Sequence, residues 1–347
     1  MKLNAISIIS LILASLSLIL TASASDHCDS RNANPSVYHF TIGRTQAAVI
    51  SDGTLTLSPA GLWSQPQLAT EAYRNNFRLG PGQDPPLLLS LNTLYLKRPD
   101  GTQILIDTGV GTTNAFGTNP PDGNFQNANL KAIGISPEEI DVVLLTHSHF
   151  DHTGNILTPN GSLIFPNALH YISRREFEFF TTDPVDLSTI PIPDNLKQIL
   201  IQTSQRPLKG IPKTQLRLFD FNTQLLPGIR ALKSNHHTPG HVSYNITDIS
   251  TPHEQLIFTG DLLYDRFVSV QRPWQIPVID IDREGGIRNR TNWMDVFARD
   301  RVKVLMYHYE FPGLGYIVET RGGWDFLPVS YEGDKGVRTV CLKNRYK

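Results

Sequence analysis

A cluster of histidines that directly follows an apolar strand constrains this chain more than any other feature of its sequence. Residues 141–145 (DVVLL) are short, β-branched and bounded by turn residues, which predicts a buried strand. The run HSHFDH at 147–152 follows and offers four possible metal ligands: His147, His149, Asp151 and His152. Side chains two apart in extended backbone point to the same side, and a turn at Phe150 would redirect the last two. One motif can therefore supply two ions.

The residue types in this run indicate which metal it would bind. Imidazole and carboxylate together suit zinc, with manganese, iron or cobalt as alternatives, whereas a calcium or magnesium site would consist mostly of oxygen. Because one run does not complete two coordination spheres, further ligands must come from distant turns or strand ends. Three side chains occupy such positions: His241 after Thr-Pro-Gly, Asp261 after the strand at 256–260, and His308 after the strand at 302–306. Each alone would be an ordinary core or turn residue, but together they predict a binuclear centre.

Strands and helices alternate along the rest of the chain, which favours a layered α/β or α+β domain. A hairpin is predicted around Asp52-Gly53, with strands at 46–51 and 54–57. Further predicted strands lie at 87–96, 103–107, 168–172, 230–233, 243–249, 255–259 and 302–306. Helices are predicted at 127–133, after Ser136, at 174–180 with Ser173 as the cap, and at 292–299. The proline-rich stretch 181–212 is predicted to be a long surface excursion that forms a wall of the site.

The ordered series Asp107, HSHFDH, His241, Asp261 and His308 resembles the five motifs of the metallo-β-lactamase superfamily. The segments FTGDL at 258–262, FPGLG at 311–315 and SDG at 51–53 resemble the branch that holds methyl parathion hydrolase and N-acyl-homoserine lactonases. Coverage runs from about Val37 to Glu332. The resemblance implies an α+β fold, a four-layer αββα sandwich of the metallo-β-lactamase type.

The same resemblance implies a ligand set for each ion. One ion would lie on His147, His149 and His241, the other on Asp151, His152 and His308, with Asp261 bridging both. Asp107 would accept the outer ring N–H of a ligand histidine and so fix its tautomer. His236 and His237 fall outside this pattern and are expected near the ligands or on the surface.

The chain lacks the motifs of rival hydrolases: a G-x-S-x-G elbow, an H-E-x-x-H helix and a Walker-type phosphate loop. Their absence fits a metal-activated water as the nucleophile. The resemblance to the lactonase branch implies a lactonase or esterase in which a hydroxide bridging two metal ions attacks. Asp151 or a metal-bound water would pass a proton to the leaving group. The resemblance implies that Tyr264 contacts the substrate carbonyl, and packing at the pocket wall is the alternative. An apolar pocket is expected from four aromatic residues: Phe150, Phe267, Trp274 and Phe311. The alternatives are an organophosphate or aryl-ester hydrolase with the same site, and a metal-binding protein without turnover.

The N-terminus predicts export. Lys2, the apolar stretch 5–21 and the small residues 22–24 are typical of a signal peptide at 1–24, with a retained membrane anchor as the alternative. An N-terminal segment at 25–36, a hydrolase domain at 37–335 and a tail at 336–347 would follow, in a secreted or periplasmic protein without stable membrane insertion after cleavage. Cys28 and Cys341 would pair as a disulfide or remain free thiols.

Charge limits the class of partner. Lysine and arginine number 31 against 32 acidic residues, without long runs of either sign, which argues against nucleic acid. A small ester or lactone is the expected partner, and relatives of this branch suggest a homodimer.

Overall fold

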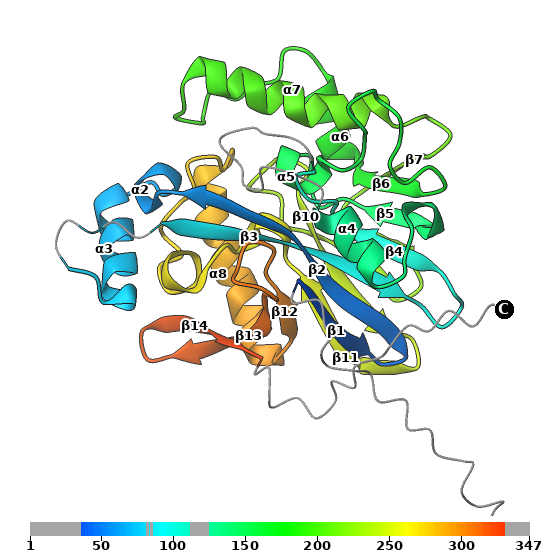
Figure 1. Cartoon of the computed structure of the whole chain (residues 1–347). Coiled ribbons are helices and arrows are strands. Elements are labelled where there is room, and N and C mark those ends of the chain that lie inside the picture. Colours follow the sequence, from blue (N-terminus) through cyan, green and yellow to red (C-terminus); the bar gives the residue numbers. More distant parts are fainter. Residues whose placement is uncertain (1–35, 81–82, 84–85, 112–124, 330–347) are drawn as a thin grey trace, which may run out of the picture. The chain divides into compact units, whose positions relative to one another are not determined.

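Two seven-stranded sheets form the centre of the fold in the computed structural model (Figure 1). The first sheet runs in chain order: β1 (Val37–Ile42), β2 (Thr45–Leu57), β3 (Leu87–Lys97), β4 (Gln103–Ile106), β5 (Val142–Leu144), β6 (Leu169–Ser173) and β7 (Leu216–Phe219). The second runs in reverse order: β14 (Gly323–Pro328), β13 (Leu314–Thr320), β12 (Lys303–Leu305), β11 (Thr251–Phe258), β10 (Val242–Asp248), β9 (Ile229–Lys233) and β8 (Gln224–Leu226). Both sheets are mixed, because β4 to β7 pair in parallel, as do β11 and β12, and the other neighbours are antiparallel.

The structure describes residues 36–80, 83, 86–111 and 125–329. The predicted signal peptide, Cys28, Cys341 and the predicted tail lie outside the described residues. Among the residues that are described, no helix is long and apolar enough to cross a bilayer.

The helices complete the layers. Their bounds are α2 (Pro59–Leu62), α3 (Pro66–Phe77), α4 (Phe125–Ala132), η2 (Pro137–Glu139), α5 (Phe150–Thr153), α6 (Arg174–Thr181), α7 (Asp194–Gly210), η3 (Gly260–Leu262), η4 (Arg266–Val270) and α8 (Arg283–Asp300). Sequence signals account for several starts: the Ser173 hydroxyl accepts the Glu176 N–H at 3.1 Å to cap α6, and Ser136 and Glu139 form a capping box around η2.

Three apolar clusters hold four layers together. One lies between the sheets and includes Leu94 of β3 and Tyr244 of β10. A second packs the outer face of the first sheet against α4, α6 and α7, and a third packs the second sheet against Met294 and Phe297 of α8. The predicted αββα sandwich is therefore confirmed.

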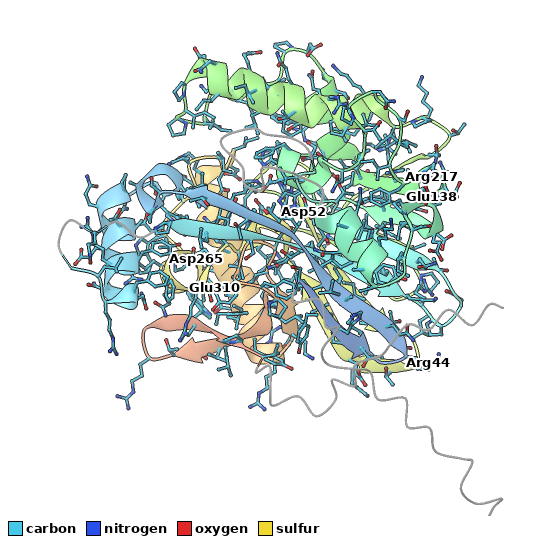
Figure 2. All side chains as sticks on the ribbon, viewed as in Figure 1. Arg44, Asp52, Glu138, Arg217, Asp265 and Glu310 are labelled. Atoms are coloured by element: carbon cyan, nitrogen blue, oxygen red, sulfur yellow. The ribbon has the colours of Figure 1, made fainter. Side chains whose placement is uncertain are left out.

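The predicted hairpin around Asp52-Gly53 is wrong. Strand β2 continues through these residues, and its register against β3 shifts between Ser51 and Thr54, as in a β-bulge. Asp52, labelled in Figure 2, is fully buried. Its Oδ2 accepts the N–H groups of Val110 at 2.7 Å and Gly111 at 3.1 Å. Asp52-Gly53, although typical of a turn, therefore lies within a strand. The Asp52 carboxylate fixes the loop that follows β4 through these two hydrogen bonds.

The predicted surface excursion at 181–212 is also wrong for most of its length, because it contains the 17-residue helix α7. Its buried face consists of Leu200, Ser204, Pro207 and Leu208. These positions have helical spacing, but serine and proline occupy two of them, which obscures the apolar period in the sequence. In Figure 1, α7 runs alongside α6 at the top of the view.

Candidate metal centre

Strand ends bring the candidate ligands together. Asp107 follows β4, HSHFDH follows β5, His237 follows β9, Asp261 follows β11 and His308 follows β12. Each of these residues lies beyond the C-terminal end of its strand, and the two sheets both contribute. This edge is where side chains from parallel strands converge, as in other layered α/β proteins.

Three groups of buried side chains could each hold a metal ion, with ligand atoms within 4.8 Å of one another. They are His147, His149 and His237; His147, His152 and Asp261; and Asp151, His152 and His308. Shared members make the three groups one continuous site. All of these side chains except His237 were predicted from the sequence as ligands.

Spacings between nitrogen and oxygen atoms fit shared cations. Asp261 Oδ1 lies 3.0 Å from His152 Nε2, and Asp261 Oδ2 lies 3.3 Å from both His237 Nε2 and His308 Nε2. Two atoms bound to the same tetrahedral zinc ion are roughly 3.3 Å apart, since each bond is about 2.0–2.1 Å. The Nε2 atoms of His147 and His152 and the Oδ1 atom of Asp261 are buried without hydrogen-bond partners. Buried polar atoms are rarely left so, and a bound cation would satisfy them.

Hydrogen bonds on the outer ring nitrogens aim four histidines inward. His152 Nδ1 lies 2.7 Å from Asp107 Oδ2, and His237 Nδ1 lies 2.9 Å from Asp280 Oδ1. His308 Nδ1 donates to the Ser90 carbonyl at 3.0 Å, and His147 Nδ1 lies 3.1 Å from the Thr146 hydroxyl. A proton held on each Nδ1 leaves a lone pair on Nε2, which is the form that binds metal.

Asp107 lies beside His152, one of the histidines predicted as ligands. Its backbone has φ +57°, a left-handed conformation that aspartate tolerates better than most residues. The carboxylate also accepts the Thr146 N–H and hydroxyl, both at 2.8 Å. Asp107 therefore joins the end of β4 to the start of the histidine run.

Electrostatics favour a cation at this point. Burial lowers the pKa of His147 and His149 well below the usual histidine range, so both imidazoles are neutral. Burial opposes ionisation of Asp261, but His308, His152 and His237 outweigh it and hold the pKa of that carboxyl well below its usual range. The result is a buried carboxylate beside two neutral imidazoles, those of His147 and His149. Burial opposes protonation of His152, but Asp261, Asp151 and Asp107 outweigh it and raise the pKa of His152 well above the usual range. Imidazole and carboxylate together are a donor set that suits zinc.

His241, which the sequence predicted as a ligand, is not part of the three clusters found among the described residues. Its Nε2 accepts the Asp261 backbone N–H at 2.9 Å. Its Nδ1 lies 2.9 Å from the Ser234 hydroxyl and 3.1 Å from the Ser234 carbonyl. His241 therefore holds the backbone of Asp261 in place through one ring nitrogen and is held by Ser234 through the other. Both ring nitrogens of His237 are engaged too, but its Nε2 lies 2.8 Å from His149 Nδ1, which belongs to the same cluster.

His237 lies in the cluster with His147 and His149, where the sequence predicted His241, and a sequence signal could have found it. The other ligands follow strand ends, and His237 follows β9 in the same way, whereas His241 immediately precedes β10. Asp280 and Glu176, both fully buried, were missed altogether, because an isolated carboxylate far along the chain carries no motif.

Tyr264 packs within the site. Its ring stacks on His308 at 5.2 Å between centroids, and its hydroxyl lies 3.1 Å from His237 Nδ1. Burial, with the nearby Asp261 carboxylate, raises the pKa of Tyr264 well above its usual range. The phenol therefore keeps its proton and can act as a hydrogen-bond donor.

A cavity of about 440 Å³ opens onto this centre. Its polar end consists of His149, Asp151, Asp261, Tyr264 and His308. Its walls are apolar: Leu55, Leu57, Leu62, Leu89, Phe150, Ile192, Leu196, Leu200, Val278 and Ile279. Neither lysine nor arginine is among the described residues that line it. Residues 181–212 do contribute a wall, as predicted, through Ile192 and α7.

The four aromatic residues predicted to line one pocket lie in three different places in the structure. Phe150 lines the cavity at the metal centre. Phe267 and Phe311 line a separate hollow of about 670 Å³ that also touches His308, together with Asp265 and Glu310, which are labelled in Figure 2. Trp274 lies in neither and is 49% exposed, so its predicted place in the pocket is wrong.

Known structures share this architecture over nearly their whole length. AidC, described as a dizinc quorum-quenching lactonase in complex with a product, has a TM-score of 0.74 at 23% identity, covering 85% of this chain and 98% of AidC. The hydrolase AbOPH of the β-lactamase superfamily has a TM-score of 0.73 at 25% identity, covering 86% and 99%. The sandwich and its buried His/Asp clusters define a metal-dependent hydrolase. The sequence profile of the metallo-beta-lactamase superfamily matches residues 89–282, more than half of the chain, and the chain belongs to that superfamily.

Curated relatives point to one branch of the superfamily. An N-acyl homoserine lactonase of Bacillus sp is 24% identical over 253 residues, covering 67% of this chain and 86% of the relative. The N-acyl homoserine lactonase AttM of Azorhizobium caulinodans is 46% identical over 57 residues, 16% of this chain and 19% of AttM. The predicted resemblance to N-acyl-homoserine lactonases is confirmed.

Proposed function

We propose that this protein is a binuclear metal-dependent lactonase that acts on neutral lactones with an apolar acyl chain. The observation that carries the proposal is the cavity, whose apolar walls end at the buried ligand cluster and whose described lining residues include neither lysine nor arginine. Such walls suit an acyl chain, and the absence of a cationic side chain among them disfavours anionic substrates. The N-acyl homoserine lactonases among its relatives support the same choice.

The residues present fit two divalent ions, for which we propose zinc. His147, His149 and His237 would hold one, Asp151, His152 and His308 the other, and Asp261 would lie between them. When bound, two such ions lower the pKa of a shared water and polarise the scissile carbonyl.

The chain's own groups would do the rest. The protonated Tyr264 phenol borders the cavity and would donate a hydrogen bond to the substrate carbonyl. Asp151 also borders the cavity, and its Oδ2 lies 3.5 Å from His308 Nε2. From there Asp151 would hold a proton and pass it to the leaving alkoxide as the ring opens. The apolar walls would exclude bulk water from the reacting bond.

The direct test measures metal content and substrate preference together. The purified protein should contain two metal ions per chain by elemental analysis and should hydrolyse N-acyl lactones faster than a phosphotriester or an aryl ester. A preference for the phosphotriester would move the proposal to an organophosphate hydrolase with the same site. Two bound ions per chain without hydrolysis of the lactone, the phosphotriester or the aryl ester would indicate a metal-binding protein without turnover.

His237→Ala and His241→Ala test the assignment of the ligand. We expect His237→Ala to lose one ion per chain, and His241→Ala to keep both sites occupied at saturating metal because His241 supports Asp261 only by a hydrogen bond. The reverse pattern would restore the ligand set implied by the sequence.

Export, the disulfide and the homodimer remain part of the proposal. Mass spectrometry of the protein from its native host should find a chain that begins near Ser25, with Cys28 and Cys341 joined. Light scattering in solution would give the oligomeric state. A mature chain that begins at Met1 would argue against export.

A further inference from the structure

A buried glutamate connects the two loops that carry the ligands. Glu176 lies in the first turn of α6 and is fully buried. Its Oε1 accepts the Ser148 N–H at 2.9 Å and the Ser148 hydroxyl at 3.1 Å. Its Oε2 accepts the Thr238 hydroxyl at 2.7 Å and the Gly240 N–H at 3.0 Å. Each carboxylate oxygen therefore serves one loop.

The two loops belong to different sheets. Ser148 lies between His147 and His149 in the loop after β5, and Thr238 is adjacent to His237 in the loop after β9. Glu176 itself belongs to none of the metal-binding groups and does not line the cavity. It therefore bonds to the neighbours of three ligands without contacting a substrate or an ion.

The surroundings of Glu176 reinforce the connection. The Ser173 hydroxyl accepts the Glu176 N–H and donates to the Gly240 carbonyl at 2.6 Å. A Cβ atom on Gly240 would lie 2.1 Å from the Glu176 nitrogen, so only glycine permits this approach. Burial raises the pKa of the Glu176 carboxyl, and its four hydrogen bonds oppose that rise.

We infer that Glu176 is a positioning residue that preorganises His147, His149 and His237 for one of the two ions. The inference rests on the proposed metal centre. Glu176 holds the two loops at a fixed separation before metal arrives, so less conformational entropy is lost when the ion binds. The residues next to Asp151, His152 and His308 donate no hydrogen bond to Glu176, whose donors are Ser148, Thr238 and Gly240. Loss of the Glu176 carboxylate should therefore weaken the binding of only one of the two ions.

Glu176→Gln tests this role, with Glu178→Gln as the matched control on the exposed face of the same helix. A glutamine keeps one acceptor oxygen but turns an NH₂ group toward the donors of one loop, which releases that loop. The measurement is metal affinity by competition with a chelator, together with the metal-free unfolding transition. Amide exchange at Ser148 and Gly240 in the metal-free protein gives a second readout.

Glu176→Gln should bind one ion about 10–100-fold more weakly than wild type and the other normally, with faster exchange at one of the two amides. Glu178→Gln should match wild type. A folded Glu176→Gln that binds both ions normally, or that weakens both equally, would overturn the inference. Absence of metal from the wild-type protein would instead refute the proposed function.

If Glu176→Gln does not fold, Ser148→Ala and Thr238→Val each remove a single hydroxyl donor. Each should weaken the same ion, by less than the glutamine substitution. Normal affinity for that ion in both variants would count against the role of Glu176.

Discussion

The ion pair behind His237 gives a prediction whose size follows from the structure. Arg290 of α8 is fully buried, and its Nη1 lies 3.0 Å from Asp280 Oδ2. The other oxygen of Asp280 faces His237 Nδ1 at 2.9 Å. Removing either partner of such a pair leaves an uncompensated charge in the interior, which costs about 3–5 kcal/mol. Asp280→Asn and Arg290→Met should each lower the free energy of unfolding by that amount.

The double variant isolates the pairing energy. Replacing both members removes both charges, and such replacements are often close to neutral, so the double variant should be far more stable than the sum of the single losses predicts. Urea unfolding of the metal-free protein, followed by circular dichroism, measures the three differences. Arg288→Met, on the exposed face of the same helix, is the control and should stay within about 0.5 kcal/mol of wild type.

The Asp280 and Arg290 variants should differ in their affinity for metal. Asp280→Asn should also weaken the ion at His237, because the ring loses the carboxylate that fixes its tautomer. Arg290→Met keeps that carboxylate and should affect metal affinity less. Strictly additive losses of stability in the double variant would refute the idea that the two charges compensate each other.

Three further outcomes are expected. Tyr264→Phe should reduce kcat on a lactone about 100-fold with metal content unchanged, and an unaltered kcat would assign Tyr264 to packing alone. Leu200→Phe should raise KM for long acyl chains and spare short ones, since Leu200 lines the cavity wall, and equal effects on both would place the chain elsewhere. Burial opposes ionisation of Asp280, but Arg290 and His237 outweigh it and hold the pKa of Asp280 below the usual range. The ionised carboxylate therefore stabilises the folded protein fully above the unfolded pKa of about 3.9, and this stabilisation is lost as pH falls below that value. The gap in unfolding free energy between wild type and Asp280→Asn should therefore narrow below about pH 4.

Most of the sheet structure could be predicted because its strands are short, apolar and β-branched, as β5 illustrates. Prediction failed where tertiary contacts changed the conformation that the local sequence favours. Asp52-Gly53 has the composition of a turn, yet burial of the Asp52 carboxylate under the loop after β4 makes it part of a bulged strand. In α7 the serine and proline of the buried face conceal a helix that becomes evident only when it packs against the first sheet.

The ligands predicted from HSHFDH, Asp261 and His308 came together because each follows the end of a strand. Residue type could not separate His241 from His237, because both are histidines and lie only four positions apart. Burial does not separate them either, since both are fully buried. The partners of their ring nitrogens separate them: His241 Nε2 accepts the Asp261 backbone N–H, whereas His237 has a carboxylate at Nδ1 and the cluster member His149 at Nε2. Carboxylates such as Asp280 and Glu176 become recognisable only once the fold brings them to the ligands.

The bond between His308 and the Ser90 carbonyl has a consequence for how the protein matures. It joins residues 218 positions apart, and Asn92, two residues further along β3, donates its N–H to the Tyr307 carbonyl. A chain that emerges from the ribosome N-terminus first would display HSHFDH long before β12 exists. Any ion captured then would have an incomplete set of ligands and could exchange freely. Only the arrival of Tyr307 and His308, which follow β12, against β3 would trap the metal, so loading should be among the last events of folding.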